Sequence, residues 1–145
     1  MNKKILIGID TGVNTGFAVA IDVGNGGDLQ KVESVSITQA MANINELVIE
    51  HGKENIKLYI EDARKRTWFT GGREKAQGVG SVKRDAQIWE DWCTEQGLNF
   101  KMIHPAANAT KKKVEDFKRM TGWTGRTNEH ARDAAMLVFK RYWKA

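Results

Sequence analysis

The chain has 145 residues, enough for one domain with a buried core but too few for two lobes, so we expect a single domain over residues 1–145. Its 23 Lys and Arg against 18 Asp and Glu give a net charge of +5, which weakly favours a polyanionic partner. The single cysteine, Cys93, excludes an internal disulfide and a paired-thiol metal site. No stretch has the length of a membrane span or the form of a signal peptide, so we expect a cytoplasmic protein without membrane contact.

Three short segments rich in apolar and β-branched residues open the chain, at residues 4–10, 15–23 and 29–37. Glycine-containing turns separate them, including the run GNGGD at 24–28. Because consecutive strands joined by short turns usually pair side by side, these segments predict an antiparallel meander.

A helix and a fourth strand follow the meander. Thr38 is a candidate N-cap, apolar residues recur at helical spacing from Met41 to Val48, and Gly52 is a natural stop. The apolar segment 56–62 then predicts a strand parallel to the first, because a helix is the usual crossover between parallel strands.

The second half of the chain alternates helices with one more strand. Residues 63–80 are basic and glycine-rich, which predicts an irregular functional loop. Helices are expected at 81–96, 111–120 and 128–143, a strand at 98–105 and a linker at 122–127. The first of these helices is expected to place Ile88, Trp89, Trp92 and Cys93 on one face, and the last to bury a face that includes Tyr142. The order βββαβαβαα predicts an α/β fold with a five-stranded mixed sheet flanked by helices.

Carboxylates stand at the ends of two strands expected to be neighbours. Asp10 ends the first strand and Glu61 the fourth, so their side chains are expected to meet at one edge of the sheet. Like charges in a partly desolvated site need a cation, and oxygen ligands suit a divalent metal. Taken alone, Asp10 is equally well explained as a turn residue. Asp62 would face the other side of the strand, where it is a weaker candidate that could pair with Arg64 or Arg66 instead.

The start of the last helix carries further ionisable residues. His130 and Asp133 are three residues apart and share a face, and Glu129 nearly shares it. Acidic residues early in a helix also favour its dipole, so each residue singly has an ordinary structural explanation. The combination of a first-strand Asp, a central-strand Glu and this helical pair makes metal catalysis the better explanation.

The segments IGIDTGVNTGFA, YIED and EHARDAAML resemble, in order and spacing, the RuvC branch of the ribonuclease H-like nucleases, the Holliday junction resolvases. The resemblance implies a ribonuclease H-like fold, with Asp10, Glu61 and Asp133 as catalytic metal ligands. His130 occupies a position held by Asp in some members and His in others, so it is a further ligand or the group that orients or deprotonates water, and Glu129 is an alternative ligand. The short form suggests, by analogy only, a bacterial or phage protein.

The same resemblance implies a reaction and an assembly. It implies hydrolysis of DNA phosphodiesters in four-way junctions by two Mg²⁺ ions, with Mn²⁺ as a substitute and water as the nucleophile. Two symmetric cuts need two active sites, so we expect a homodimer, with the helix at 81–96 as the expected contact. Trp89 and Trp92 in that helix are equally compatible with an ordinary core.

Two basic segments are candidate DNA contacts, because cations bind phosphates and aromatic rings stack on unpaired bases. The first comprises Arg64, Lys65, Arg66, Trp68, Phe69, Arg73, Lys75, Lys83 and Arg84. The second comprises Lys111, Lys112 and Lys113, with Lys118, Arg119 and Arg126 beyond them. Both segments are also compatible with a solvated surface.

Three other functions remain open at this point. An RNA-processing nuclease would share the carboxylates, and a non-catalytic protein would bind branched DNA without cutting it. An actin-like phosphotransferase would use the Asp-x-Gly turn at residue 10 to hold phosphate, but the chain is too short for its two lobes.

Overall fold

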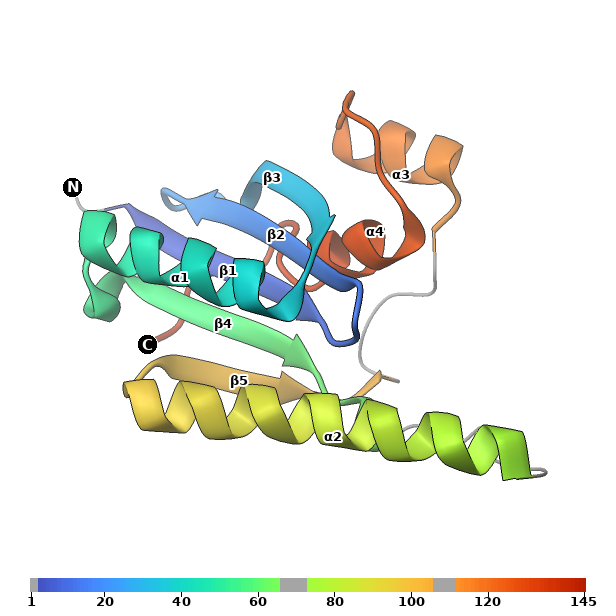
Figure 1. The fold of residues 1–145 in the computed structure, drawn as a ribbon. Coiled ribbons are helices and arrows are strands. Elements are labelled where there is room, and N and C mark those ends of the chain that lie inside the picture. Colours follow the sequence, from blue (N-terminus) through green and yellow to red (C-terminus); the bar gives the residue numbers. More distant parts are fainter. Residues whose placement is uncertain (1–2, 66–72, 106–111) are drawn as a thin grey trace.

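The computed structural model describes residues 3–65, 73–105 and 112–145, with the backbone alone at 73–79 and at 82. Its elements are β1 (Lys4–Asp10), β2 (Thr15–Asp22), β3 (Asp28–Val35), α1 (Ile37–His51), η1 (Lys53–Asn55), β4 (Ile56–Glu61), η2 (Ala63–Lys65), α2 (Arg73–Gln96), β5 (Asn99–Ile103), α3 (Val114–Thr121) and α4 (Glu129–Met136) (Figure 1).

One mixed sheet organises these elements. Its strand order is β3-β2-β1-β4-β5, with β1–β2 and β2–β3 antiparallel and β1–β4 and β4–β5 parallel. The expected meander, the parallel fourth strand and the order of helices and strands are thus confirmed. Within the described ranges, no helix is both long and apolar enough to cross a lipid bilayer.

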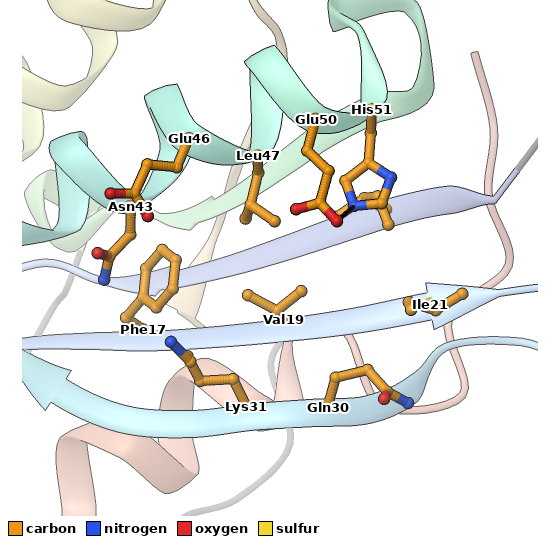
Figure 2. Close-up of a pocket in the computed structure, with 11 residues that line it drawn as sticks. Phe17, Val19, Ile21, Gln30, Lys31, Asn43, Glu46, Leu47, Glu50 and His51 are labelled. Atoms are coloured by element: carbon orange, nitrogen blue, oxygen red, sulfur yellow. Dashed lines mark ion pairs between the residues drawn. The ribbon is translucent and has the colours of Figure 1, made fainter.

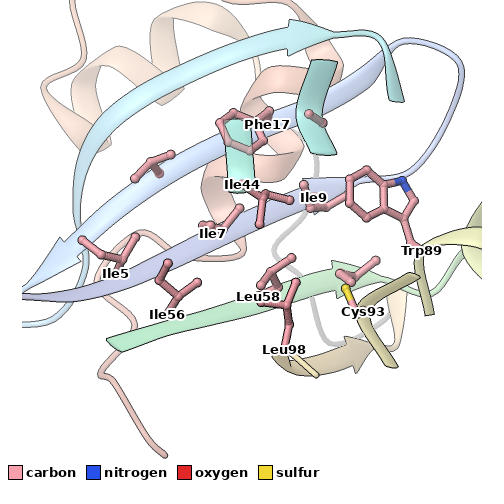
Figure 3. Packing of buried hydrophobic residues seen from close by; sticks show 13 residues of the cluster. Ile5, Ile7, Ile9, Phe17, Ile44, Ile56, Leu58, Trp89, Cys93 and Leu98 are labelled. Atoms are coloured by element: carbon pink, nitrogen blue, oxygen red, sulfur yellow. The ribbon is translucent and has the colours of Figure 1, made fainter. Parts of the chain in front are cut away.

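The two faces of the sheet carry separate cores. Ile5, Ile7 and Ile9 of β1 face α1 and α2, where they pack with Trp89 and Cys93 (Figure 3). The alternate residue Leu6 faces α4, in a second core with small residues of that helix. Side chains alternate between faces along a strand, so β1 contributes to both cores. Trp89 is fully buried, which confirms its interpretation as a core residue.

The second helix is longer than expected, and one residue of its predicted apolar face is exposed. It begins at Arg73, so residues 73–80 are helical and the prediction of an irregular loop there was wrong. Strong helix formers outweigh the two glycines in this stretch, each of which costs a helix about 1 kcal/mol. Ile88 is 39 % exposed, although we expected it on the same face as Trp89 and Cys93, which are buried. It lies one residue, or about 100°, from the buried line through Trp89 and Cys93.

Two other helices begin later or earlier than expected. Ser36, and not Thr38, caps α1, because its side chain accepts a hydrogen bond from the Gln39 amide at 3.1 Å, and β3 accordingly ends at Val35. The third helix begins at Val114, and not at residue 111.

The final helix ends at Met136, seven residues before the expected end. The chain then turns at Lys140, whose φ of 60° lies in the left-handed region, and Tyr142 is exposed where we expected it to be buried. Backbone hydrogen bonds between Gly27 and both Lys140 and Arg141, at 2.7 Å each, hold this tail against the turn between β2 and β3. These bonds replace those that a longer helix would have made.

Asp22 joins that turn to the tail. Its Oδ1 accepts hydrogen bonds from the amides of Gly24 at 2.7 Å and Gly26 at 3.1 Å, and its Oδ2 accepts one from the amide of Trp143 at 2.7 Å. The Trp143 amide contributes most to holding the pKa of the Asp22 carboxyl below its ordinary value.

We therefore predict that Asp22→Ala lowers the free energy of unfolding at pH 7 by about 1–3 kcal/mol, because three amides lose a charged acceptor. A carboxyl with a lowered pKa stabilises the fold above its ordinary pKa of about 3.9 and ceases to do so as the pH falls through the folded value. The difference from the wild type should consequently shrink in urea titrations at acid pH. An equal difference at pH 7 and pH 2 would contradict this account.

Candidate active site

Asp10 and Glu61 meet at one edge of the sheet. They end the neighbouring parallel strands β1 and β4, one residue beyond the paired Ile9 and Ile60. Both carboxyls are on the α4 face, and only 3 % of Asp10 and 5 % of Glu61 is exposed. The predicted convergence of these two strand-end carboxylates is thus present in the fold.

The start of α4 places two further ionisable groups at the same edge. Nδ1 of His130 lies 3.0 Å from Oδ2 of Asp10, and Asp133 is close enough for its charge to act on the Asp10 carboxyl. Asn128 fixes this end of the helix by accepting a hydrogen bond from the Ala131 amide at 2.9 Å. Asp133 is buried, whereas 48 % of the His130 side chain is exposed and accessible to water.

Two glycines allow α4 to lie this close to the strands. A Cβ atom on Gly16 of β2 would stand 2.0 Å from the carbonyl oxygen of His130. One on Gly8 of β1 would stand 2.1 Å from the carbonyl oxygen of Ala134. Because backbone atoms cannot move aside as a side chain can, the absence of a side chain at these two positions sets the distance between helix and sheet.

Burial and like charges act together on Asp10. The pKa of its carboxyl is raised to about 7. Desolvation is the largest cause, the charges of Glu61 and Asp133 also raise it, and the hydrogen bond and charge of His130 lower it. A carboxylate surrounded in this way is under-compensated by positive charge.

The chemistry of this cluster suits a divalent cation. Carboxylate oxygens are the ligands that suit Mg²⁺ and Mn²⁺, and a cation would relieve the repulsion at Asp10. Sequence reasoning missed Thr11, whose Oγ1 is buried beside Asp10 and has no hydrogen-bond partner among the described residues. Within the same ranges, no three His, Cys, Asp or Glu side chains are already arranged as metal ligands. The residues thus fit a metal by charge and chemistry, and coordination would require their side chains to reorient.

Asp62 belongs to a different arrangement. Its two oxygens accept hydrogen bonds from Arg64 at 2.7 and 2.9 Å, and the arginine holds the pKa of this carboxyl below its usual range. Arg64 also contacts Gln87 at 2.8 Å and Glu90 at 3.1 Å, so it links the end of β4 to α2. The alternative interpretation of Asp62, pairing with Arg64, is confirmed, and Arg64 is a candidate DNA contact that already has protein partners.

The other candidate DNA contacts are spread over several elements. Lys65, Lys83 and Arg84 are exposed on η2 and α2, and Lys113 is exposed at the start of α3. The backbone oxygen of the half-buried Lys112 accepts a hydrogen bond from Arg132 of α4 at 2.9 Å. Lys118, Arg119 and Arg126 are also exposed, as is Glu129 at the first position of α4. Arg73 and Lys75 lie on α2 with undescribed side chains, and Arg66, Trp68, Phe69 and Lys111 lie outside the described residues.

A hollow of about 330 Å³ lies on the opposite face, between α1 and the strands β2 and β3 (Figure 2). Phe17 and Val19 line its floor, and Glu46, Glu50 and His51 stand on the helix above. Because Asp10 and Glu61 face the other side of the sheet, this hollow is separate from the acidic cluster.

We predict that Gly16→Ala displaces α4, because the new methyl group would overlap the His130 carbonyl. The free energy of unfolding should fall by about 1–3 kcal/mol, as for other overpacked sites. Gly80→Ala in α2 is the matched control, since a Cβ there meets nothing within 4 Å and alanine favours a helix. Thermal unfolding should therefore move in opposite directions for the two variants, and an unchanged melting temperature for Gly16→Ala would contradict the close packing.

We also predict that Asp10→Asn stabilises the metal-free protein. Because the pKa of the Asp10 carboxyl is raised in the folded state, the free energy of unfolding falls as the pH rises from about 4 to about 7, and this loss is complete at pH 8. Removing the charge in EDTA should increase the free energy of unfolding at pH 8 by about 1–2 kcal/mol, with little effect near pH 3. Asp28→Asn, at an exposed position of β3, should have little effect at either pH. An Asp10→Asn variant whose free energy of unfolding at pH 8 equals that of the wild type would argue against repulsion between crowded carboxylates.

Comparison with known proteins assigns no family to the chain. No protein-family model matches it. A search of curated proteins also found no significant match. We therefore infer its function from the residues and their geometry.

Proposed function

We propose that this chain is a metal-dependent endonuclease that cuts branched DNA, as its resemblance to the RuvC-type resolvases implies. The observation that carries the proposal is the convergence of Asp10, Glu61, Asp133 and His130 at one sheet edge. These residues come from three segments far apart in the sequence, and their crowding raises the energy of the cluster until a cation binds. A ribonuclease H-like assignment of the α/β fold is part of this proposal.

Asp10, Glu61 and Asp133 would hold Mg²⁺ or Mn²⁺ through their carboxylate oxygens. When bound, two such ions would neutralise the phosphate and lower the pKa of an attacking water. Thr11 would supply a hydroxyl beside the cluster, where its buried Oγ1 can bond to a water or to the substrate.

His130 would position or deprotonate that water. Asp10 accepts the hydrogen bond from Nδ1 in the tautomer that carries its proton there, which leaves Nε2 as a proton acceptor. The exposure of the ring gives water and substrate access to it. In the alternative role, as a metal ligand, the ring would have to leave Asp10.

The exposed cations of η2, α2 and α3 would bind phosphates of the DNA on the way to this cluster. Two symmetric cuts in a junction would require a homodimer. The first half of α2 extends past the end of β5 and is the element that we propose for the contact between subunits (Figure 1). Cys93 and Trp89, in its second half, are already used by the core of the same chain.

We predict that the protein introduces paired nicks into a labelled immobile four-way junction, but not into a linear duplex of the same sequence, in the presence of Mg²⁺ or Mn²⁺. Cleavage should stop in EDTA and fall by about 100-fold or more in Asp10→Asn, because the cluster loses a metal ligand. Asp28→Asn, which removes the same charge from an exposed position, should cut normally.

Three outcomes would contradict the proposal. Cleavage of structured RNA but not of the junction would identify an RNA-processing nuclease. Tight junction binding without cutting under any divalent metal would identify a non-catalytic binding protein. Full activity of Asp10→Asn would place the reaction away from the acidic cluster.

A further inference from the structure

A strongly basic hollow lies near the start of β4, on the same face of the sheet as the acidic cluster. Its volume is about 400 Å³, and its walls come from β4, β5 and the tail that follows α4. Five cations line it: Lys57, Lys101, Lys140, Arg141 and Lys144. Neither basic segment singled out in the sequence contains any of these five residues. We call this hollow the basic pocket.

No acidic side chain lines the basic pocket among the residues that the structure describes. Within the same ranges, none of its five cations forms an ion pair with a carboxylate. Burial is the largest cause that lowers the pKa of the Lys57 ammonium, followed by the charges of Lys101, Arg141 and Lys144. Positive charges that repel one another in this way are the electrostatic mark of a site for an anion.

The cations at the floor of the pocket are held in place before any ligand binds. The Arg141 guanidinium lies over the ring of Tyr59 at 4.5 Å from its centre, and its Nε donates to the Leu137 carbonyl at 2.6 Å. Lys57 lies 5.4 Å from the centre of the same ring and donates to the Lys144 carbonyl at 3.2 Å. Tyr59 itself is buried, so it forms a fixed platform under the two charges.

Lys140, which lines the pocket, has an unusual backbone conformation. This residue has a φ of 60°, a conformation that glycine or asparagine adopts at lower energy. A lysine in this position is unfavourable for the fold, while it adds a charge to the pocket.

The position of the pocket relates it to the acidic cluster. Lys57, Tyr59 and Glu61 alternate along β4, so all three side chains are on one face. At about 3.3 Å per residue, Lys57 is roughly 13 Å along the strand from Glu61. One strand of a duplex rises about 3.4 Å along its axis for each phosphate and also winds around that axis, so this separation corresponds to only a few phosphates.

We propose that the basic pocket binds the sugar–phosphate backbone of the nucleic acid substrate, a few nucleotides from the phosphate that is cut. The inference rests on the proposed nuclease function for the identity of the ligand. A pocket that is lined by five cations, wider than one phosphate and on the same face of the sheet as the cluster fits a polyanion better than a single small anion. The exposed Tyr142 at its rim adds a surface for a sugar or an unpaired base.

The test compares two double variants in EDTA, where cleavage cannot interfere. Lys101→Gln with Lys144→Gln removes two exposed charges from the pocket, and Lys31→Gln with Lys53→Gln removes two from the opposite side of the sheet. We expect the pocket variant to bind a labelled junction about tenfold more weakly and to reduce the slope of log affinity against log salt by about 2. The control variant should change both the affinity and the salt slope much less.

Lys140→Gly separates binding from folding. It should raise or preserve the melting temperature, because glycine suits the left-handed backbone, while it weakens binding.

Several results would overturn the inference. Equal affinities and salt slopes for the two double variants would do so, as would a wild-type protein that binds no nucleic acid. Inorganic phosphate or a nucleoside triphosphate that competes as well as DNA, concentration for concentration, would identify a small-anion pocket instead. A wild-type protein that binds the junction but does not cleave it with any divalent metal would contradict the nuclease proposal and leave these binding measurements valid.

Discussion

The close approach of α4 to β1 and β2 is the contact on which the acidic cluster depends. Gly8 and Gly16 leave no side chain between the strands and the helix backbone, so the helix lies directly against the sheet. The first turn of α4 thereby brings His130 to Asp10 and Asp133 into its electrostatic reach. Any side chain at these positions would widen the gap between helix and sheet and separate these ionisable groups.

The same contact creates a conflict between stability and function. Packing α4 onto the sheet removes water from Asp10 while it adds the charge of Asp133 to that of Glu61. Without a counter-ion this cluster destabilises the fold, and the apolar cores on both sides of the sheet must offset that free-energy cost. Such an unfavourable cluster, kept in a small domain, is what a site that binds a cation and a phosphate requires.

Local patterns in the sequence predicted most of the sheet and the residues of the cluster, because strand alternation and strand-end carboxylates are encoded within short segments. The predictions were wrong or incomplete where contacts between segments far apart in the sequence determine the structure. The last helix ends at Met136 because Asp22 and Gly27 bind the tail, and no pattern in residues 137–143 reveals those partners. The basic pocket escaped notice for the same reason, since its cations come from positions 57, 101 and 140–144. The pairing of Arg64 with Asp62 could be foreseen from their spacing, but its second partner Glu90, 26 positions away, could not.

The alternation of side chains along β1 has a consequence for accuracy in folding. Ile9 faces the core beneath α1, and its neighbour Asp10 faces α4. A slip of one residue in the pairing of this central strand would exchange the two, placing a carboxylate in hydrocarbon and an isoleucine among acids. Such a misfolded state would be unstable and would lose the acidic cluster, so the residues that set the register of this strand are the same ones that form the proposed site.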